Sequence, residues 1–579
     1  MDFHGIYALL STTGKINFEK CSFFDEEVLD DGLFAGYKNV QYSDKEKHII
    51  KLKNDCYLIY DQFSFSDSTS FLNELRQLES KSITLNEIIK KKSSDWGDLC
   101  IIYIDIRNKI VLLAPDLRNH FPIFYRIEKE FIAFSTIQSF LLKLADCNID
   151  ENSVYERICL GHSLWDKTLF KEIKQIPACC LTVVEKGICK TIRYFPEEID
   201  KIEFPGLEIF KDTLETTIKP VAGIEGSRLA LSGGLDSRLI LGSMLNLGIK
   251  PSIFLFGETK SPDCIISKKI SDKYSLDLLH IIPDTKFLET LPQIIMEHIS
   301  EGEGICDLDS LHSHLVYKLI KDKIPVLIEG NYMGNPRGIL NDFCNGALSN
   351  PRIFMSNQLL TNYYPFFNED PQKINDSLLE NLSDIPEWAE NLPDYYYYEF
   401  NRRGKRVSKE TVIQRNYLSA FNPLETQAFA KQVFMIPQSM SRNSRFFWDL
   451  LTSLKSDLSM IPLESHGFYM HNGNSRLENL LIKGYDRLRI QLGLNSARYH
   501  SFSSSKNFDT IRPSLEILLD EIKTTLPSPL KFSNYVLEDD DYIVPLLRFA
   551  SISLWLVKYK EFSSEKFSSL ENSLISRIK

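Results

Sequence analysis

The sequence predicts an α+β N-terminal domain built on antiparallel sheet, followed by an α/β domain with a parallel sheet and a helical C-terminal part. Short β-like runs broken by polar turns fill the first 200 residues, and strands alternate with helices from about Pro205 onward. Beyond about residue 350 the pattern is mostly helical. A chain of 579 residues also exceeds one ordinary hydrophobic core. We therefore expect two domains, residues 1–204 and 205–579.

The composition is that of a globular protein, with 43% apolar and 25% charged residues. A net charge of -11 gives no electrostatic reason to expect nucleic-acid binding. The N-terminus MDFHGIYALLSTTGK has no basic segment before its short apolar run, and no stretch is long enough to span a membrane. The eleven cysteines are scattered, as expected for reduced thiols. We therefore expect a cytoplasmic protein with neither a membrane nor a nucleic acid as partner.

The N-terminal domain contains a predicted β-hairpin. Two apolar runs, 99–106 and 109–116, are joined by a tight turn at Arg107–Lys109, and a further strand is expected over 131–136. Such neighbouring strands favour an antiparallel sheet.

The second domain alternates strands and helices. The strands are expected over 227–232, 251–256, 277–282 and 324–328, and the helices over 235–247, 263–274 and 310–321. This alternation is typical of a parallel sheet covered by helices on both faces. Amphipathic segments follow toward the C-terminus, for example over 542–559, and amphipathic helices of the C-terminal third could mediate a homodimer.

The segment LSGGLDS lies where the first of these buried strands gives way to a helix. Two glycines allow a tight turn and close approach of a ligand, while hydroxyls and the amides of the helix N-terminus can donate to phosphate oxygens. A glycine turn with a helix-capping serine is the purely structural alternative. The residues expected around the phosphates are Leu231, Ser232, Gly233, Gly234, Leu235, Asp236 and Ser237.

Asp236 decides between these two readings. A carboxylate beside a phosphate is repulsive unless a cation lies between them, so we assign Asp236 as the ligand of a Mg²⁺ ion. The motif resembles that of the PP-loop ATP pyrophosphatases, which cleave ATP between the α and β phosphates, and GxxxxGK[ST] is absent. The expected cofactors are ATP and Mg²⁺.

Motifs in the N-terminal domain resemble those of the asparagine synthetase family in the same order. They are Gly97–Asp98, Asp116–His120, Pro122–Tyr125, 134–142, Lys167–Ile173 with Pro177, and Arg193–Phe195. The resemblance implies that residues 1–204 form a class II glutamine amidotransferase domain, an Ntn-type sandwich. It also implies that residues 205–579 form an adenylating synthetase domain.

The chain departs from this family at its beginning. The family starts Met-Cys-Gly-Ile and uses the cysteine as nucleophile, whereas this chain reads Phe3–His4–Gly5–Ile6 with three residues ahead of the histidine. A histidine cannot form the thioester, and no N-terminal amine lies beside it to act as base. Glutamine is therefore not expected as nitrogen donor, and we expect His4 to pack or hydrogen-bond rather than to react.

In the synthetase half, the resemblance implies that adenosine lies near Leu231 and Phe256, at the carboxyl ends of the first two strands. After the fourth strand the family reads SGEGADELFGG, and its aspartate holds a second Mg²⁺ position. Here Gly334 occupies that place, within a segment that includes Gly330 as a nucleotide contact and Tyr332 as a candidate base. A substitute ligand could come from Asp307, Asp309 or Glu329.

A lysine that contacts pyrophosphate in the family is Ser465 in this chain. Lys455 is the candidate that we assign to this role, with Arg442 and Arg445 as alternatives. For each of these residues a surface ion pair is the structural alternative.

From these expectations we predict that the protein is an AMP-forming carbon–nitrogen ligase. It would adenylate a substrate carboxylate, release pyrophosphate and join the acyl group to an amine of a small molecule or peptide. Family members that lack the cysteine include β-lactam synthetases and lasso-peptide macrolactam synthetases of natural-product biosynthesis. The alternatives are a non-catalytic nucleotide-binding or partner protein of a biosynthetic complex, and an ammonia-dependent asparagine synthetase.

Overall fold

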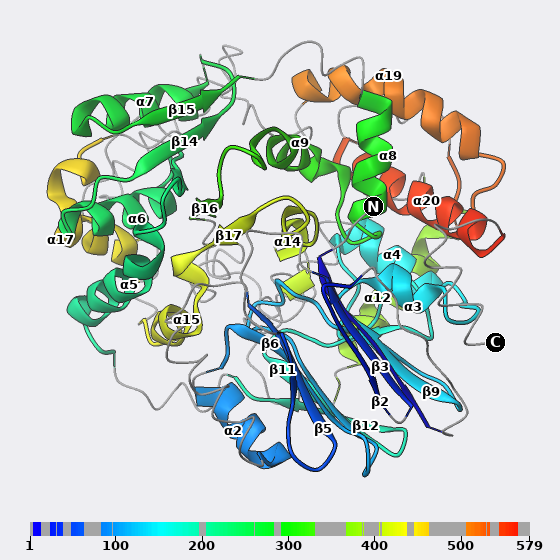
Figure 1. The fold of residues 1–579 in the computed structure, drawn as a ribbon. Coiled ribbons are helices and arrows are strands. Elements are labelled where there is room, and N and C mark those ends of the chain that lie inside the picture. The colour runs from blue at the N-terminus through cyan, green and yellow to red at the C-terminus, as the bar shows by residue number, and fades with distance from the viewer. Residues whose placement is uncertain are drawn as a thin grey trace.

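The computed structural model describes residues 4–12, 24–30, 32–38, 48–62, 83–94, 96–195, 204–259, 261–282, 291–330, 366–384, 386, 404–405, 408–436, 440, 445–461, 505–527, 530–532 and 543–564. Within these ranges the fold is α+β, with two antiparallel sheets and one parallel sheet (Figure 1). The expected boundary between the two domains, near residue 204, follows residues 196–203, which lie outside the described ranges.

Two six-stranded antiparallel sheets make up the N-terminal region. The first has the order β10-β8-β9-β1-β3-β2 and consists of β1 (Gly5–Ser11), β2 (Glu26–Asp30), β3 (Leu33–Lys38), β8 (Phe124–Ile127), β9 (Phe131–Ser135) and β10 (Lys174–Gln175). The second has the order β12-β11-β7-β6-β5-β4 and consists of β4 (Ile49–Lys51), β5 (Cys56–Gln62), β6 (Leu99–Asp105), β7 (Ile110–Ala114), β11 (Cys180–Glu185) and β12 (Ile188–Arg193). The hairpin predicted across Arg107–Lys109 is confirmed, because β6 and β7 pair antiparallel.

The parallel sheet has the order β15-β14-β13-β16-β17, and every pairing in it is parallel. Its strands are β13 (Arg228–Ala230), β14 (Ser252–Phe256), β15 (Leu278–Ile281), β16 (Val326–Ile328) and β17 (Ser419–Phe421). The first four match the predicted strands. The fifth strand, β17, was not predicted from the sequence. It belongs to the region beyond residue 350, whose other described elements are helices, as expected, and it pairs with β16 at one side of the sheet.

Helices surround these sheets. Those predicted over 235–247, 263–274, 310–321 and 542–559 correspond to α6 (Leu235–Asn246), α7 (Pro262–Tyr274), α9 (Leu311–Ile320) and α20 (Ile543–Ser564). The others used below are α2 (Leu85–Ser94), α3 (Gln138–Leu142), α4 (Glu151–Leu160), α5 (Leu207–Ala222), α8 (Leu291–Glu301), α12 (Pro371–Ser383), α14 (Thr411–Gln414), α15 (Gln427–Phe434), α17 (Arg445–Ser459) and α19 (Ser505–Ile522).

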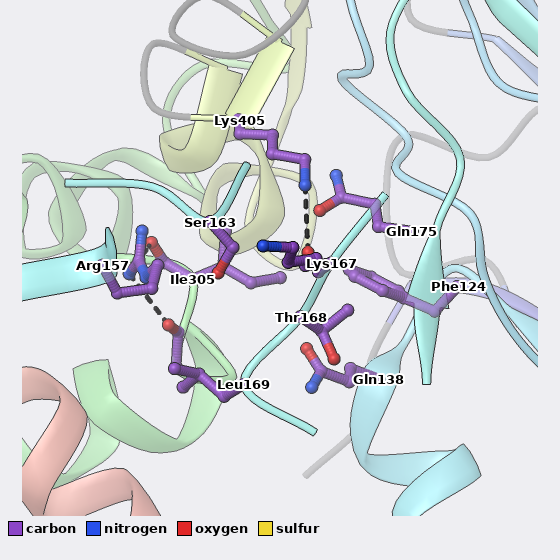
Figure 2. A pocket seen from close by; sticks show the side chains of 11 residues that line it. Phe124, Gln138, Arg157, Ser163, Lys167, Thr168, Leu169, Gln175, Ile305 and Lys405 are labelled. Carbon is purple, nitrogen blue, oxygen red and sulfur yellow. Dashed lines mark hydrogen bonds between the residues drawn. The ribbon is translucent and has the colours of Figure 1, made fainter. Parts of the chain in front are cut away.

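Buried polar contacts join the antiparallel sheets to the rest of the chain. Gln427 accepts a hydrogen bond from the Gly97 amide at 2.9 Å and donates its own amide to Asp98 at 2.6 Å. Farther along, Lys405 Nζ donates to the backbone oxygen of Lys167 at 2.9 Å (Figure 2). The N-terminal region is therefore fixed against segments that follow it by more than 200 residues.

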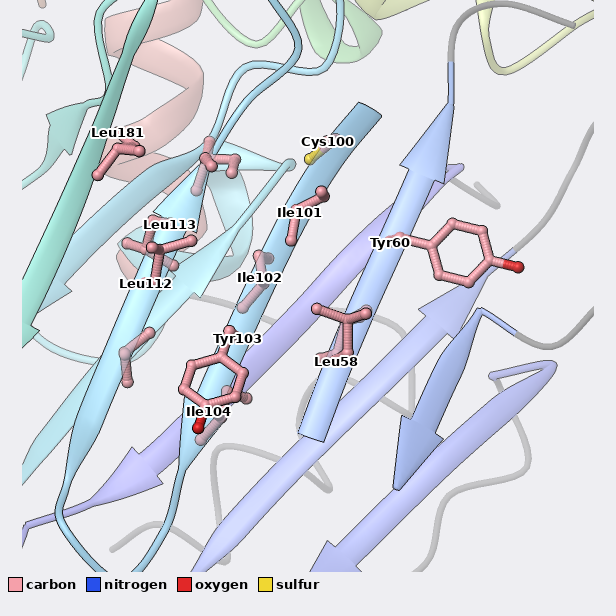
Figure 3. Close-up of a cluster of buried hydrophobic side chains, with 14 of the residues drawn as sticks. Leu58, Tyr60, Cys100, Ile101, Ile102, Tyr103, Ile104, Leu112, Leu113 and Leu181 are labelled. Carbon is pink, nitrogen blue, oxygen red and sulfur yellow. The ribbon is translucent and has the colours of Figure 1, made fainter. Parts of the chain in front are cut away.

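The N-terminal core lies between the two antiparallel sheets. Alternate side chains of β1 and β3 pack with those of the second sheet. Figure 3 shows buried side chains of the second sheet, including Leu58, Ile102 and Leu112. On its other face the first sheet packs against a helical cluster that contains α4, α8, α19 and α20. The side chains of α20 that the structure describes, up to Val557, are buried almost throughout and pack within this cluster.

Among the described residues, no helix combines the length and apolar character that crossing a membrane requires. Dimerisation stays a prediction.

Candidate functional site

The motif Leu231–Ser237 connects β13 to α6. In the parallel sheet β13 lies between β14, which follows it in the chain, and β16, which comes much later. From β13 the chain continues to β14 and β15 on one side of the sheet, and from β16 it continues to β17 on the other. Ligands of open parallel sheets bind at such a switch point, outside the carboxyl ends of the strands. The motif therefore lies at the place where a ligand is physically expected.

Two serine hydroxyls close the motif into a ring. Ser237 Oγ accepts from the Ser232 amide at 3.1 Å and lies 3.0 Å from Ser232 Oγ. The Ser232 hydroxyl in turn accepts from the Gly234 amide at 3.1 Å. These bonds stabilise the turn from within the motif.

The N-terminus of α6 faces this turn. Its N-cap residue is Gly234, so no side chain at this position caps the helix. The N–H groups of a first helical turn have no intrahelical partners and attract anions. Gly330, two residues after β16, lies directly against this turn: a Cβ atom at Gly330 would lie 2.8 Å from the Ser237 nitrogen and 2.9 Å from the Asp236 carbonyl carbon. Gly330 therefore lies against the loop, and its role as a nucleotide contact stays a prediction.

Arg238 stabilises the backbone of the motif by hydrogen bonds. Its guanidinium is fully buried, donates to the Gly233 carbonyl at 2.9 Å and also donates to the carbonyl of Ile461. This contact links the loop to the residue directly before the segment that contains Ser465. Residues 462–504, including Ser465, lie outside the described ranges.

A carboxylate that the sequence reasoning did not assign, Asp263, contacts the loop. It follows β14 in the first turn of α7 and accepts a hydrogen bond from the Gly233 amide. Ser261 caps the same helix by accepting from the Cys264 amide at 3.2 Å. The signal was present, because a Ser-Pro-Asp sequence after a buried strand is typical of a helix start.

The carboxylates near the loop suit Mg²⁺ only if phosphate completes its coordination. Asp236 is half-buried in the first turn of α6, and Asp263 is half-buried at the neighbouring strand end. The described residues contain no group of three or more acidic, histidine or cysteine side chains arranged to hold a metal. Since Mg²⁺ in nucleotide sites commonly takes one or two carboxylates and several phosphate or water oxygens, the donor set fits a nucleotide-dependent ion rather than a resident one.

Glu329 brings a third acidic side chain to this edge of the sheet. It lies between β16 and Gly330, is half-buried, and accepts from Gln414 Nε2 at 3.1 and 3.2 Å. Burial raises the pKa of Glu329 to about 7, and the nearby carboxylates of Glu410 and Glu425 act in the same direction. A carboxyl group of this kind exchanges a proton near neutral pH.

The other two substitute ligands considered from the sequence are engaged elsewhere. Asp307 is fully buried and pairs with Arg157 at 3.0 Å and with Lys409 at 2.7 Å. Asp309 pairs with the same lysine at 3.0 Å. Of the three candidates, only Glu329 adjoins a residue that touches the loop.

Phe256 is the last residue of β14 and is half-buried at the carboxyl edge of the sheet. Its backbone oxygen accepts a weak hydrogen bond from Cys264 Sγ at 3.8 Å. The structure thus places Phe256 on the strand next to the loop, as the sequence expectation required.

The structure does not bring Lys455 to the loop. Its ammonium lies 6.0 Å from the ring centre of Tyr274, the last residue of α7. Tyr274 follows the loop contact Asp263 by eleven residues, which is about 16 Å along a helix at 1.5 Å per residue. Arg445, an alternative, lies 3.9 Å from Asp449 one turn later in the same helix. Tyr332 and Arg442 lie outside the described residues.

The N-terminal position that resembles the nucleophile site of the family contains a buried contact between a histidine and a carboxylate. His4 is 2% exposed, and its Nε2 lies 3.0 Å from Asp61 Oδ2. The His4 backbone amide donates to Asn416 at 3.1 Å, and the Tyr37 hydroxyl donates to Asp61 at 3.5 Å. The expectation that His4 packs and hydrogen-bonds agrees with these contacts.

Comparisons with known proteins do not assign this chain to a family. No protein-family model and no curated protein sequence matches the chain. A solved structure described as that of the allosteric regulatory enzyme of purine biosynthesis is similar over 48% of this chain and 75% of its own, with 7% identity and a TM-score of 0.20. A similarity at this level supports neither a fold assignment nor a function.

Proposed function

We propose that this protein is an ATP-dependent synthetase that adenylates a substrate carboxylate and joins it to an amine, forming an amide bond and releasing pyrophosphate and AMP. The observation that carries the proposal is the glycine-capped N-terminus of α6, held against Gly330 at the switch point of a parallel sheet. It combines with the motif resemblance to the asparagine synthetase family.

The loop would hold the phosphates through hydrogen bonds from the first turn of α6. Because the Ser232–Ser237 ring and Arg238 already fix the backbone, little reorganisation would be needed on binding. Asp236 is the first candidate for holding Mg²⁺ and Asp263 the second. The ion would supply charge neutralisation of the phosphates. These residues would position the α-phosphorus for attack by the substrate carboxylate.

Glu329 is our candidate for the base that accepts a proton from the attacking amine. Its position beside Gly330 keeps it near the loop, and a pKa of about 7 allows it to accept a proton at neutral pH. Tyr332, the base suggested by the family resemblance, stays a prediction. Lys455 has no place in this proposal, because it lies beside Tyr274.

The nitrogen would come from an amine rather than from glutamine. We interpret the two antiparallel sheets as a class II glutamine amidotransferase domain of the Ntn type that has lost its nucleophile. His4 occupies the position of the family's cysteine, and its Nε2 lies 3.0 Å from Asp61. A histidine there provides no thiol to form a thioester. The cysteine-less members of the family point to a macrolactam, β-lactam or related amide of natural-product biosynthesis.

The experiment is ATP–pyrophosphate exchange with Mg²⁺ against a panel of small acids and short peptides. We expect exchange that depends on one acid and falls by at least 100-fold in Asp236→Asn, because the charge that holds Mg²⁺ is removed. Asp272→Asn, an exposed aspartate in the last turn of α7, is the matched control and should exchange like wild type.

No exchange with any acid, together with nucleotide binding unaffected by Asp236→Asn, would contradict the catalytic proposal and leave a nucleotide-binding or partner protein. Formation of asparagine from aspartate and ammonium would instead identify an ammonia-dependent asparagine synthetase.

A further inference from the structure

A cavity lies where the N-terminal region meets the second half of the chain, separate from the loop at residues 231–237. We call it the junction cavity and define it by Gln138, Arg157, Lys167, Thr168, Ile305 and Lys405 (Figure 2). It measures about 30 Å³. This is room for about two water molecules or one small ion.

The lining of the cavity carries positive charge. Of the lining residues that the structure describes, three are cationic and none is an aspartate or glutamate. Two of the cations are matched by carboxylates outside the lining: Arg157 by Asp307 at 3.0 Å and Lys167 by Glu156 at 2.8 Å. The third, Lys405, donates to a neutral acceptor, the Lys167 carbonyl.

Lys405 is therefore a buried charge without an ion-pair partner among the described residues. It is 5% exposed. Burial lowers the pKa of Lys405 to about 7, while Asp166 and Glu156 favour its charged form and Lys167 and Lys174 oppose it. An anion in the cavity would compensate the desolvation of this ammonium.

Two further donors in the lining have no acceptor within the described part of the chain. They are Nε2 of Gln138 and Nε of Arg157, on side chains that are 3% and 4% exposed. Gln138 is held in place because its backbone amide donates to Glu303 at 2.6 Å. In Figure 2, Gln138 and Lys405 extend from opposite sides of the segment that carries Lys167 and Thr168. Buried donors of this kind are normally satisfied, so the cavity lacks an acceptor.

We propose that the junction cavity binds a small oxyanion, either a carboxylate or inorganic phosphate, with Lys405 as its cationic partner and the lining donors that lack acceptors, such as the Gln138 amide, as further ligands. Its walls come from the N-terminal region and from residues 304–305 and 405, so the bound anion stabilises the contact between the two parts of the chain. This site is independent of the adenylating reaction proposed above.

The test is titration of the full-length protein with sodium acetate and, separately, with sodium phosphate, at ionic strength held constant with sodium chloride. Binding is followed by calorimetry and by the shift in melting temperature. We expect saturable binding of at least one of the two anions in wild type and in Lys171→Met, an exposed lysine on the same segment. Affinity should fall at least tenfold in Lys405→Met and in Gln138→Leu.

Gly330→Ala separates this site from the phosphate loop, because the change distorts the loop and leaves the cavity intact. Binding that persists in Gly330→Ala and is lost in Lys405→Met supports the junction cavity. Acetate affinity should also weaken between pH 6 and pH 8, as Lys405 loses its proton.

Equal affinities in wild type and Lys405→Met, or melting shifts reproduced by sodium chloride alone, would overturn the proposal and leave a water-filled cavity. If Lys405→Met does not fold, the anion affinity of Gln138→Leu is compared with that of wild type instead. The separate titrations distinguish a carboxylate from phosphate as ligand.

Discussion

At the scale of single residues, Glu329 combines partial burial with a titration near neutral pH. Its pKa is raised from 4.5 to about 7, so the folded state binds its proton more tightly than the unfolded chain does. The contribution of the protonated group to stability is therefore complete below about pH 4.5 and is lost as the pH rises through 7. Near and above pH 7, where Glu329 would be ionised and could act as a base, its ionisation lowers the free energy of unfolding.

Replacing Glu329 with glutamine keeps its size and removes this titration. We expect Glu329→Gln to have a higher free energy of unfolding than wild type above pH 7, with a difference that vanishes near pH 4.5, in urea unfolding with EDTA present. Glu521→Gln, an exposed residue of α19, should show no such pH dependence. An identical pH profile for wild type and Glu329→Gln would show that Glu329 is not perturbed.

At the scale of elements, the site depends on how closely the end of β16 approaches the start of α6. A Cβ at Gly330 would contact backbone atoms of Asp236 and Ser237, which cannot move aside as a flexible side chain could. We expect Gly330→Ala to destabilise the protein by roughly 1–3 kcal/mol, as overpacking does, and to abolish pyrophosphate exchange because the loop shifts.

Gly223→Ala is the matched control for this prediction. Gly223 ends α5 at a φ of -86°, and a Cβ there meets no atom within 4 Å. It should leave both the melting temperature and exchange near their wild-type values. If Gly330→Ala behaves in the same way, the close packing between β16 and α6 is not essential to the site.

The elements also show what the sequence could predict. Buried parallel strands such as β14 are short apolar runs followed by helices with clear start signals, so each could be recognised locally. The strand β17 could not, because three residues carry no periodicity and their partner β16 lies some 90 residues earlier in the chain. The candidate site was predicted where it depends on one motif, but Asp263 joins it from another strand end.

At the scale of the whole molecule, one buried ion cluster ties the antiparallel sheets to the segments around the parallel sheet. Asp307 lies between Arg157 of α4 and Lys409, and no local sequence pattern could have paired residues separated by 150 and 102 positions. Although burial opposes its ionisation, the Lys409 ammonium and the Arg157 guanidinium hold the pKa of Asp307 well below its usual range. Its contribution to stability is therefore present above about pH 4 and is lost as the pH falls further.

Removing this single charge should weaken the molecule as a whole. Asp307→Asn keeps the shape of the side chain but leaves Arg157 without its carboxylate partner and Lys409 with only the more exposed Asp309. We therefore expect a loss of about 3–5 kcal/mol in the free energy of unfolding at pH 7. Asp309→Asn removes a more exposed carboxylate from the same Lys409 and should cost less than about 1 kcal/mol. Urea unfolding of both variants beside wild type measures the difference. Because Asp307 joins the two regions, its loss should lower the midpoint for both together; if only one region unfolded earlier, the cluster would stabilise that region rather than their association.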